Sequence, residues 1–384
     1  MAYSVLTPRK VVYGAGALDQ AASHLAQMGT KALVVTDAMM GKLGNLQKVL
    51  DVLAGAGIAS AVYDAVNAEP TDEVVRSGAQ LFAGEGCDFM VALGGGSPLD
   101  TMKAIALMVS SGCDIDEFLG QEYTGTVCPM AAIPTTAGTG SEATQFTIIT
   151  DTARDIKMLL RGEALIPQLA IIDPQFTLTA PASVTSATGV DALCHAVEAY
   201  TSRKAQPIAD TFALSAVKRI FANLLTCYTD PDNIEARTQM AVAAFEAGVA
   251  FNNSSVTIVH GMSRPIGALF HIPHGLSNAM LLGCCLRHVV DGAYDRFAQL
   301  ARFCNISSSA DDATAAQAFV AAVEDLLKQL DIVTLRGYGV DEAAFRDAIP
   351  KMAADAMASG SPSNTIKPVN EEDLQTLYAE VYGL

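Results

Sequence analysis

Four of the six histidines in this chain lie between residues 195 and 274, and an aspartate stands near the first of them. In TGVDALCHAVEAY, Asp191 and His195 are four residues apart, so a helix would place both side chains on one face. Downstream, HGMSRPIGALFHIPHG contains His260, His271 and His274, with glycines and prolines that let the chain turn back toward one point. Alone, the first pair is also typical of a solvated Asp–His contact. Together, these side chains form a candidate site for a metal cation.

The chemistry of this candidate site follows from its mixed donors. One carboxylate and two or three imidazoles suit Fe²⁺ or Zn²⁺, whereas Mg²⁺ prefers oxygen ligands and Cu⁺ prefers sulfur. Such a set leaves coordination positions open for a substrate. A divalent ion there would favour the alkoxide of an alcohol and polarise the carbonyl of an aldehyde. Beside a nicotinamide ring, this would complete an arrangement for hydride transfer.

A second motif, DFMVALGGGSPLD, predicts a phosphate-binding turn. A buried strand runs into Gly94, Gly95 and Gly96, and we expect Ser97 and Pro98 to start a helix as N-cap and first-turn residue. A pyrophosphate could approach the main chain closely here and meet the positive end of the helix dipole. The alternative is a tight glycine turn without a ligand.

Two further features are expected at the same sheet edge. The stretch IPTTAGTGSEATQF carries Thr135, Thr136 and Thr139, which could bind adenine and phosphate through hydroxyls and amides, or form a structural polar loop. Asp37 ends the run ALVVT. A carboxylate at that position accepts hydrogen bonds from ribose hydroxyls and repels a 2′-phosphate, which favours NAD over NADP. The alternative for Asp37 is a helix N-cap.

The elements that must position these residues fall into two halves. Apolar runs at 32–36, 58–63, 88–93, 130–134 and 169–173 predict strands, and amphipathic segments at 42–56, 71–85 and 98–110 predict helices between them. The short run VVYG at 11–14 is interpreted as a simple turn. This βαβ alternation predicts a Rossmann-like parallel sheet covered by helices.

After Asp173 and Pro174 the strand signals vanish, and from Ser183 to the C-terminus the sequence predicts successive helices. They are expected to break at Pro207, Pro231, Pro265, Pro273 and around 359–362. We therefore expect an α/β dinucleotide-binding domain at 1–180 and an all-α metal-binding and catalytic domain at 181–384, with ligands in the cleft between them.

Composition excludes several classes of protein. With 51% hydrophobic residues and only 17% charged ones, the 384-residue chain can bury a large core, so disorder is excluded as its main state. Its formal charge of −17 disfavours nucleic acid and anionic membrane surfaces as partners. The start of the chain lacks the pattern of a secretion signal, and the eight irregularly spaced cysteines suggest reduced thiols. We expect a cytoplasmic protein.

Taken in order, GGGSPLDTMK, PTTAGTGSE, DALCHAVEAY and HGMSRPIGALFHIPHG resemble the signatures of the iron-containing (group III) alcohol dehydrogenases, and the resemblance covers essentially the full length. It implies the dehydroquinate-synthase-like fold of that family and a homodimer or larger homo-oligomer. It implies metal ligands at Asp191, His195, His260 and His274. It also implies NAD contacts at Asp37, Gly94, Gly95, Gly96, Ser97, Asp100, Thr135, Thr136, Thr139 and Lys157.

One position departs from the family pattern. Many relatives read HGMAHP where this chain reads HGMSRP, so Arg264 replaces a histidine sometimes assigned to a proton relay. His271 is a candidate substitute, and an ordinary loop histidine is the alternative. Arg264 lies one helical turn beyond His260 and could bind a carboxylate, phosphonate or sulfonate of the substrate. Alternatively, it pairs with a surface carboxylate, leaving an apolar pocket lined by Phe146 and Phe251 for simple alcohols.

The sequence thus predicts a metal-dependent, NAD(H)-linked oxidoreductase acting on a small primary alcohol and its aldehyde, or on a hydroxy acid and its semialdehyde. Fe²⁺ is the expected cation, with Zn²⁺ or another divalent ion as alternatives. A dehydroquinate-synthase-like lyase is disfavoured, because its phosphorylated and carboxylated substrate needs more basic residues than this cleft segment offers. A non-catalytic NAD-binding sensor and a metal-dependent hydrolase are the alternatives from other classes.

Overall fold

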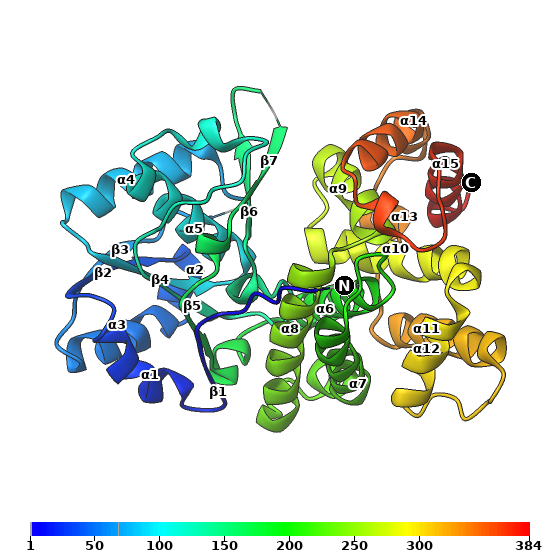
Figure 1. The fold of residues 1–384 in the computed structure, drawn as a ribbon, viewed down its shortest axis with the longest axis horizontal. Coiled ribbons are helices and arrows are strands. Elements are labelled where there is room, and N and C mark those ends of the chain that lie inside the picture. Colours follow the sequence, from blue (N-terminus) through cyan, green and yellow to red (C-terminus); the bar gives the residue numbers. More distant parts are fainter. Residues whose placement is uncertain (1, 68, 155) are drawn as a thin grey trace. The chain divides into compact units, whose positions relative to one another are not determined.

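The computed structural model describes residues 2–67, 69–154 and 156–384, and the chain divides into two compact units (Figure 1). One unit is Leu6–Ala180. The other is Pro181–Leu384 together with the N-terminal segment that ends at Val5. The first unit is the α/β half of the chain, and the second is the helical half.

A parallel sheet forms the centre of the α/β unit. Its strands follow the order β1-β8-β5-β4-β2-β3, and every neighbouring pair is parallel. The strands are β1 (Lys10–Tyr13), β2 (Lys31–Val35), β3 (Ala59–Tyr63), β4 (Phe89–Gly94), β5 (Met130–Pro134) and β8 (Leu169–Ile172). The helices are α1 (Ala17–Leu25), α2 (Ala38–Lys42), α3 (Asn45–Gly55), α4 (Asp72–Gly84) and α5 (Gly96–Ser111). The predicted α/β fold is confirmed.

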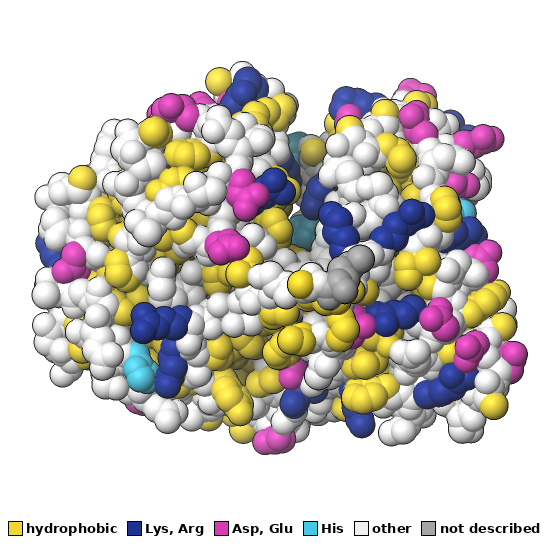
Figure 2. Space-filling view, viewed as in Figure 1, with side chains coloured by type: hydrophobic (Ala, Val, Ile, Leu, Met, Phe, Trp, Pro, Cys, Tyr) yellow, Lys and Arg dark blue, Asp and Glu magenta, His cyan; other side chains and the backbone are white. Residues whose placement is uncertain are grey.

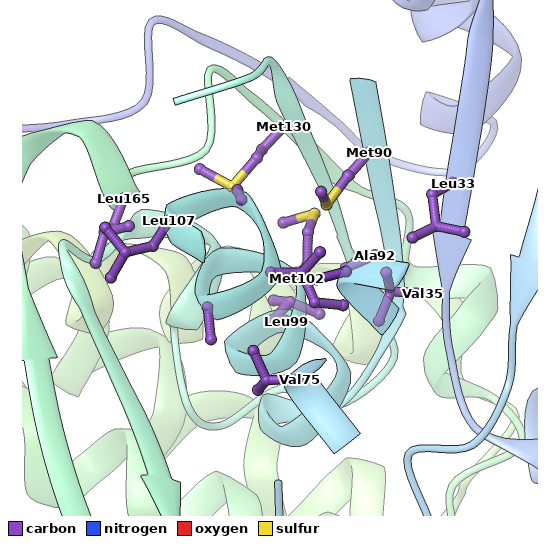
Figure 3. Close-up of a cluster of buried hydrophobic side chains, with 14 of the residues drawn as sticks. Leu33, Val35, Val75, Met90, Ala92, Leu99, Met102, Leu107, Met130 and Leu165 are labelled. Carbon is purple, nitrogen blue, oxygen red and sulfur yellow. The ribbon is translucent and has the colours of Figure 1, made fainter. Parts of the chain in front are cut away.

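Alternating residues of the central strands pack on opposite faces of this sheet. Met90 and Ala92 of β4 belong to a buried cluster with residues of α4 and α5, among them Val75 and Met102 (Figure 3). Val91, the residue between them, belongs to a second cluster with residues of α1 and α3. Helices therefore cover both faces, which explains why the strand sequences are continuously apolar instead of alternating.

Two local predictions for this unit are wrong, and one pair of strands was not predicted. Residues 10–13 form the edge strand β1, paired with β8, and the turn begins only at Gly14. The single helix expected at 42–56 is divided by Gly44, whose φ of 76° is left-handed and starts a new helix. An antiparallel hairpin of β6 (Phe146–Asp151) and β7 (Ile156–Arg161) was not predicted. Each depends on pairing or turn geometry that local apolar patterning does not encode.

The helical unit consists mainly of α-helices that follow one another along the chain. They are α6 (Ala182–Tyr200), α7 (Pro207–Thr229), α8 (Ile234–Ser254), α9 (Ile258–Phe270), α10 (His274–Val289), α11 (Tyr294–Phe303), α12 (Asp312–Gln329), α13 (Leu335–Tyr338), α14 (Glu342–Ala358) and α15 (Glu371–Tyr382). Pro207 opens α7 and Pro273 precedes α10, as predicted. The break expected at Pro265 is wrong, because this buried proline lies inside α9, which packs against α10 and α14. Tertiary packing there outweighs the cost of a proline in a helix.

Over the described residues, no helix is both long and apolar enough to cross a membrane. Figure 2 shows acidic and basic side chains scattered among apolar ones on the visible face. All eight cysteines are free thiols, and five of them are buried.

Candidate metal and dinucleotide sites

Three helices supply the four predicted metal ligands. Asp191 and His195 lie one turn apart in α6, His260 lies in the first turn of α9, and His274 is the first residue of α10. One ligand atom of each lies within 4.8 Å of the others. Asp191 Oδ1 is 3.7 Å from His260 Nε2, 3.9 Å from His274 Nε2 and 4.0 Å from His195 Nδ1. The structure therefore brings these side chains together around one point.

Burial and charge prepare the four side chains to act as ligands. Burial acts to raise the pKa of Asp191, but electrostatic interactions with the three histidines and the hydrogen bond from Asn278 outweigh it and lower the pKa, so the carboxylate is ionised. Burial lowers the pKa of His195 to about 3, so this imidazole is neutral and keeps a lone pair for a cation. Asp191, His195 and His260 are buried, whereas the side chain of His274 is 40% exposed. The cluster is therefore reached from the side of His274.

An unsatisfied buried atom supports a cation at this point. In the described part of the chain, His195 Nδ1 is buried and has no hydrogen-bond partner. A buried acceptor without a partner costs about 1–3 kcal/mol. The ring of Phe251 in α8 stacks on His195 with 4.2 Å between centroids, which fixes the imidazole in this orientation. A divalent ion would satisfy Nδ1 together with the other three donors, so the residues present fit a metal.

Glu198 is a functional residue that the sequence analysis missed. It lies three residues after His195 in α6, and its Oε2 lies 2.5 Å from His260 Nδ1. Its Oε1 accepts hydrogen bonds from Thr257 Oγ1 and from the backbone N–H of Val259. Burial acts to raise the pKa of Glu198, but His260 and these hydrogen bonds lower it, so the group is a carboxylate. It holds the proton of His260 on Nδ1 and turns Nε2 toward the cluster.

Asn278, four residues after His274 in α10, was also missed. Its Nδ2 is 2.7 Å from Asp191 Oδ1, 3.1 Å from His260 Nε2 and 3.2 Å from His274 Nε2. An amide nitrogen has two hydrogens for these three acceptors. In the described structure, Asn278 Oδ1 is buried and unpartnered. The spacing of four after His274 is the signal that could have identified this residue.

His271 does not belong to the cluster. It caps the C-terminus of α9 with a left-handed φ of 54° and is exposed. Its proposed role in proton transfer therefore stays a prediction. Phe146 lies on β6 in the α/β unit, whereas Phe251 lies in the helical unit, and a shared substrate pocket also stays a prediction.

The glycine turn in the α/β unit differs in one detail from the prediction. The N-cap of α5 is Gly95 rather than Ser97, so the helix begins two residues earlier and Ser97 and Pro98 lie inside its first turn. Gly95 offers no side chain to cap the first amides, which leaves them available for an anion. A Cβ on Gly94 would lie 2.4 Å from Pro98 Cγ, so only glycine fits where the strand meets the helix.

The threonine loop packs directly against this turn, as the common sheet edge predicts. Gly94 pairs with Pro134 in the register of β4 and β5, and the Thr135 N–H donates to the Gly94 carbonyl. A Cβ on Gly96 would lie 3.1 Å from Thr139 Cγ2, and one on Gly95 would lie 3.5 Å from Thr136 Oγ1. The two predicted phosphate-binding segments therefore form one surface.

A fully buried lysine, Lys103, holds the threonine loop in place through hydrogen bonds. Lys103 Nζ donates to Ser141 Oγ, Thr144 Oγ1 and the Phe146 carbonyl at 2.9–3.0 Å. Burial lowers the pKa of Lys103 to about 8, although Asp100 and Glu142 oppose this shift. Asp100 accepts from Ser141 Oγ and from the backbone N–H at position 148. Asp100 thus braces the loop, and its direct contact with NAD stays a prediction.

Asp37 and Lys157 occupy the other predicted NAD positions. Asp37 is the N-cap of α2, and its Oδ1 accepts from the amides of Met39 and Met40. Oδ2 makes no hydrogen bond to any described residue, so capping leaves an oxygen for a ribose hydroxyl. Lys157, exposed on β7, forms an ion pair with Glu69 at 2.7 Å. Both contacts with NAD stay predictions.

A parallel α/β unit with a glycine turn, and a helical unit with a buried Asp–His cluster, define a metal-dependent dehydrogenase. The chain belongs to the iron-containing alcohol dehydrogenase family. The family model described as "Iron-containing alcohol dehydrogenase" matches residues 8–174, and "Fe-containing alcohol dehydrogenase family, C-terminal" matches residues 185–382.

Similar proteins span nearly the whole chain. A 1,3-propanediol dehydrogenase of Klebsiella pneumoniae is 34% identical over 99% of both chains. An NAD-dependent methanol dehydrogenase of Bacillus methanolicus is 39% identical over 82% of this chain and 84% of its own. The crystal structure of a 1,3-propanediol oxidoreductase, 34% identical, superposes with a TM-score of 0.96 over 99% of this chain and 100% of its own. The predicted family, fold and enzyme class are confirmed.

Proposed function

We propose that this protein interconverts a small primary alcohol and its aldehyde, or a hydroxy acid and its semialdehyde, by hydride transfer with NAD(H) at a divalent metal. The observation that carries the proposal is the convergence of four donor atoms within 4.8 Å. One of them, the buried Nδ1 of His195, has no hydrogen-bond partner among the described residues. Relatives that are named NAD-dependent methanol dehydrogenase and 1,3-propanediol dehydrogenase support the reaction class.

Asp191, His195, His260 and His274 would hold the cation, with Fe²⁺ favoured by the family and Zn²⁺ suited to the same donors. A divalent ion there supplies the Lewis acidity that polarises the oxygen of the alcohol or aldehyde. Glu198 keeps His260 in the binding tautomer. The α/β unit would bind NAD through the glycine turn, the threonine loop and Asp37, whose charge disfavours a 2′-phosphate.

The test is to remove metal from the protein, reload it with Fe²⁺ or Zn²⁺, and assay alcohols and aldehydes by the absorbance of NADH. Metal-dependent turnover of NAD(H) supports the proposal. Binding of NADH without turnover of any substrate would indicate a sensor. Product formation without net change in NADH would indicate a lyase that uses NAD transiently.

Two variants test the placement of the metal. His260→Ala and His274→Ala each remove one imidazole, and we expect both to lose the metal and turnover while NADH binding is retained, because the glycine turn lies in the other unit. Metal content by mass spectrometry decides the question. Full occupancy in both variants would show that the site has been assigned to the wrong residues.

We also propose that residues 1–180 form the NAD-binding domain and residues 181–384 the catalytic domain, and that the protein works in the cytoplasm as a homo-oligomer. The eight free thiols support a reducing compartment. The family resemblance supports the oligomer. Light scattering of the purified protein and fractionation of the source cells test these two statements.

A further inference from the structure

Arg264 occupies a defined position on α9, the helix that also carries His260. It lies four residues after His260 in α9, so both side chains share one face of the helix, with Cβ atoms about 5–6 Å apart. Its Nη1 donates to Ser361 Oγ at 3.1 Å. Gly261 allows this contact, because a Cβ there would lie 2.7 Å from Pro362 and push the 359–362 turn away from the helix. The packing of α9 therefore holds the guanidinium in place.

Glu198 offsets the charge of this guanidinium only at a distance. Among the described residues, no carboxylate oxygen lies within ion-pair distance of Arg264, so the pairing with a surface carboxylate is not seen. Burial lowers the pKa of Arg264, and the one charge that opposes this effect is Glu198. Both oxygens of Glu198 are already taken by Thr257, Val259 and His260. An arginine stays protonated under these conditions.

The local balance of charge favours an anion. Asp191 and Glu198 contribute two negative charges, whereas Arg264 and a bound divalent cation would contribute three positive ones. Arg264 is partly exposed, so an anionic ligand can reach its guanidinium. A ligand with one negative charge close to the metal would restore neutrality.

Resting on the proposed function, we propose that Arg264 binds an acid group of the substrate, so that the enzyme acts on short hydroxy acids and their aldehyde acids. A guanidinium binds carboxylate or sulfonate oxygens through two parallel hydrogen bonds, which a lysine cannot reproduce. Because Arg264 and His260 share one helix face, we expect a short acid to reach both, and the test uses substrates whose acid group lies close to the reacting carbon.

The experiment compares each acid with a neutral molecule of the same shape in the metal-loaded protein. The carboxylate pair is 3-hydroxypropanoate and 3-hydroxypropanamide, and the sulfonate pair is 2-hydroxyethanesulfonate and 2-(methylsulfonyl)ethanol. We expect the ratio of kcat/KM, acid over neutral, to fall at least tenfold in Arg264→Met and less in Arg264→Lys. The pair with the larger fall identifies the acid group. Lys218→Met, which removes a positive charge elsewhere in the helical unit, should leave the ratio unchanged.

A binding measurement separates this inference from the proposed function. Calorimetry with propanoate and ethanesulfonate, which cannot be oxidised at an alcohol carbon, should show binding to the metal- and NAD-loaded protein that weakens at least tenfold in Arg264→Met. Metal content and circular dichroism of the variant report on its folding. If no alcohol is turned over but this loss is seen, the proposed function fails and the anion site stands. If Arg264→Met changes acid and neutral substrates by one factor, or changes neither, the inference is overturned.

Discussion

Replacing Glu198 by glutamine tests how the protein sets the protonation of a metal ligand. The amide oxygen can still accept from Thr257 and Val259, so the helix contacts persist. The amide nitrogen then faces His260 Nδ1 and donates to it, whereas the carboxylate accepts from it. His260 must therefore move its proton to Nε2, the atom that faces Asp191. Glu198→Gln converts a ligand atom into a donor without removing any ligand.

The magnitude follows from this switch of tautomer. Changes to the partner of a ligating histidine typically weaken metal affinity by about 10–100-fold, or roughly 1.4–2.7 kcal/mol. We expect the upper half of this range, because the His260–Glu198 pair is fully buried and water cannot replace the lost acceptor. Affinity for the cation and the metal-dependent kcat should fall together, and the Kd for NADH should not change.

The assay is competition for Zn²⁺ between the protein and a chelator of known affinity, with Co²⁺ absorption as a second measure of ligand geometry. Glu246→Gln is the matched control, because Glu246 is a largely buried carboxylate of the same unit that contacts Ser215 and Arg219 instead. An affinity within threefold of wild type in Glu198→Gln, with unchanged Co²⁺ spectra, would refute the tautomer argument.

Three further variants test other parts of the site. Asp37→Asn keeps a cap for α2 but removes a charge whose repulsion of a 2′-phosphate is about 1–4 kcal/mol. The kcat/KM for NADPH relative to NADH should therefore rise at least tenfold. An unchanged ratio would show that the ribose binds elsewhere. Burial raises the pKa of Glu142 from 4.5 to about 7, so its ionisation costs stability, roughly 3 kcal/mol in total, as pH rises through that interval. Glu142→Gln should therefore raise Tm over wild type more at pH 8 than at pH 5, and equal differences would contradict the assignment. Asn278→Ala removes a hydrogen-bond donor to Asp191, so the Tm of the metal-free protein should fall. Zn²⁺ should then raise the Tm of this variant more than that of wild type. An equal rise of Tm in both proteins would show that the amide does not stabilise the metal-free site.

Local sequence patterns were sufficient to predict the continuously apolar, buried strands and the amphipathic helices. The strands β2, β4 and β5 fall within one residue of their predicted bounds. Each is buried on both faces, so its sequence is a continuous apolar run that marks both ends of the strand. The edge strand β1 is short and half exposed, so its only signal is the pairing with β8, which lies about 160 residues away along the chain. Distant pairing of this kind leaves no local trace.

The site shows the same division between local and distant information. The spacing of Asp191 and His195 follows from helix geometry, and His260 and His274 stood out because histidine is rare in this chain. Glu198 did not stand out, since a glutamate in a helix is ordinary until α9 places His260 Nδ1 against it. Asn278 is neutral and common in type, so its spacing of four after His274 is a weak signal until the folded structure places its amide nitrogen close to three ligand atoms.

The amide of Asn278 gives the metal-free protein an interior partner for its ligands. Its two hydrogens can reach Asp191 of α6 and His260 of α9, so this side chain of α10 can link the three helices without a cation. We therefore expect loss of the metal to leave these helices in place, so that a cation can leave and return without unfolding of the protein.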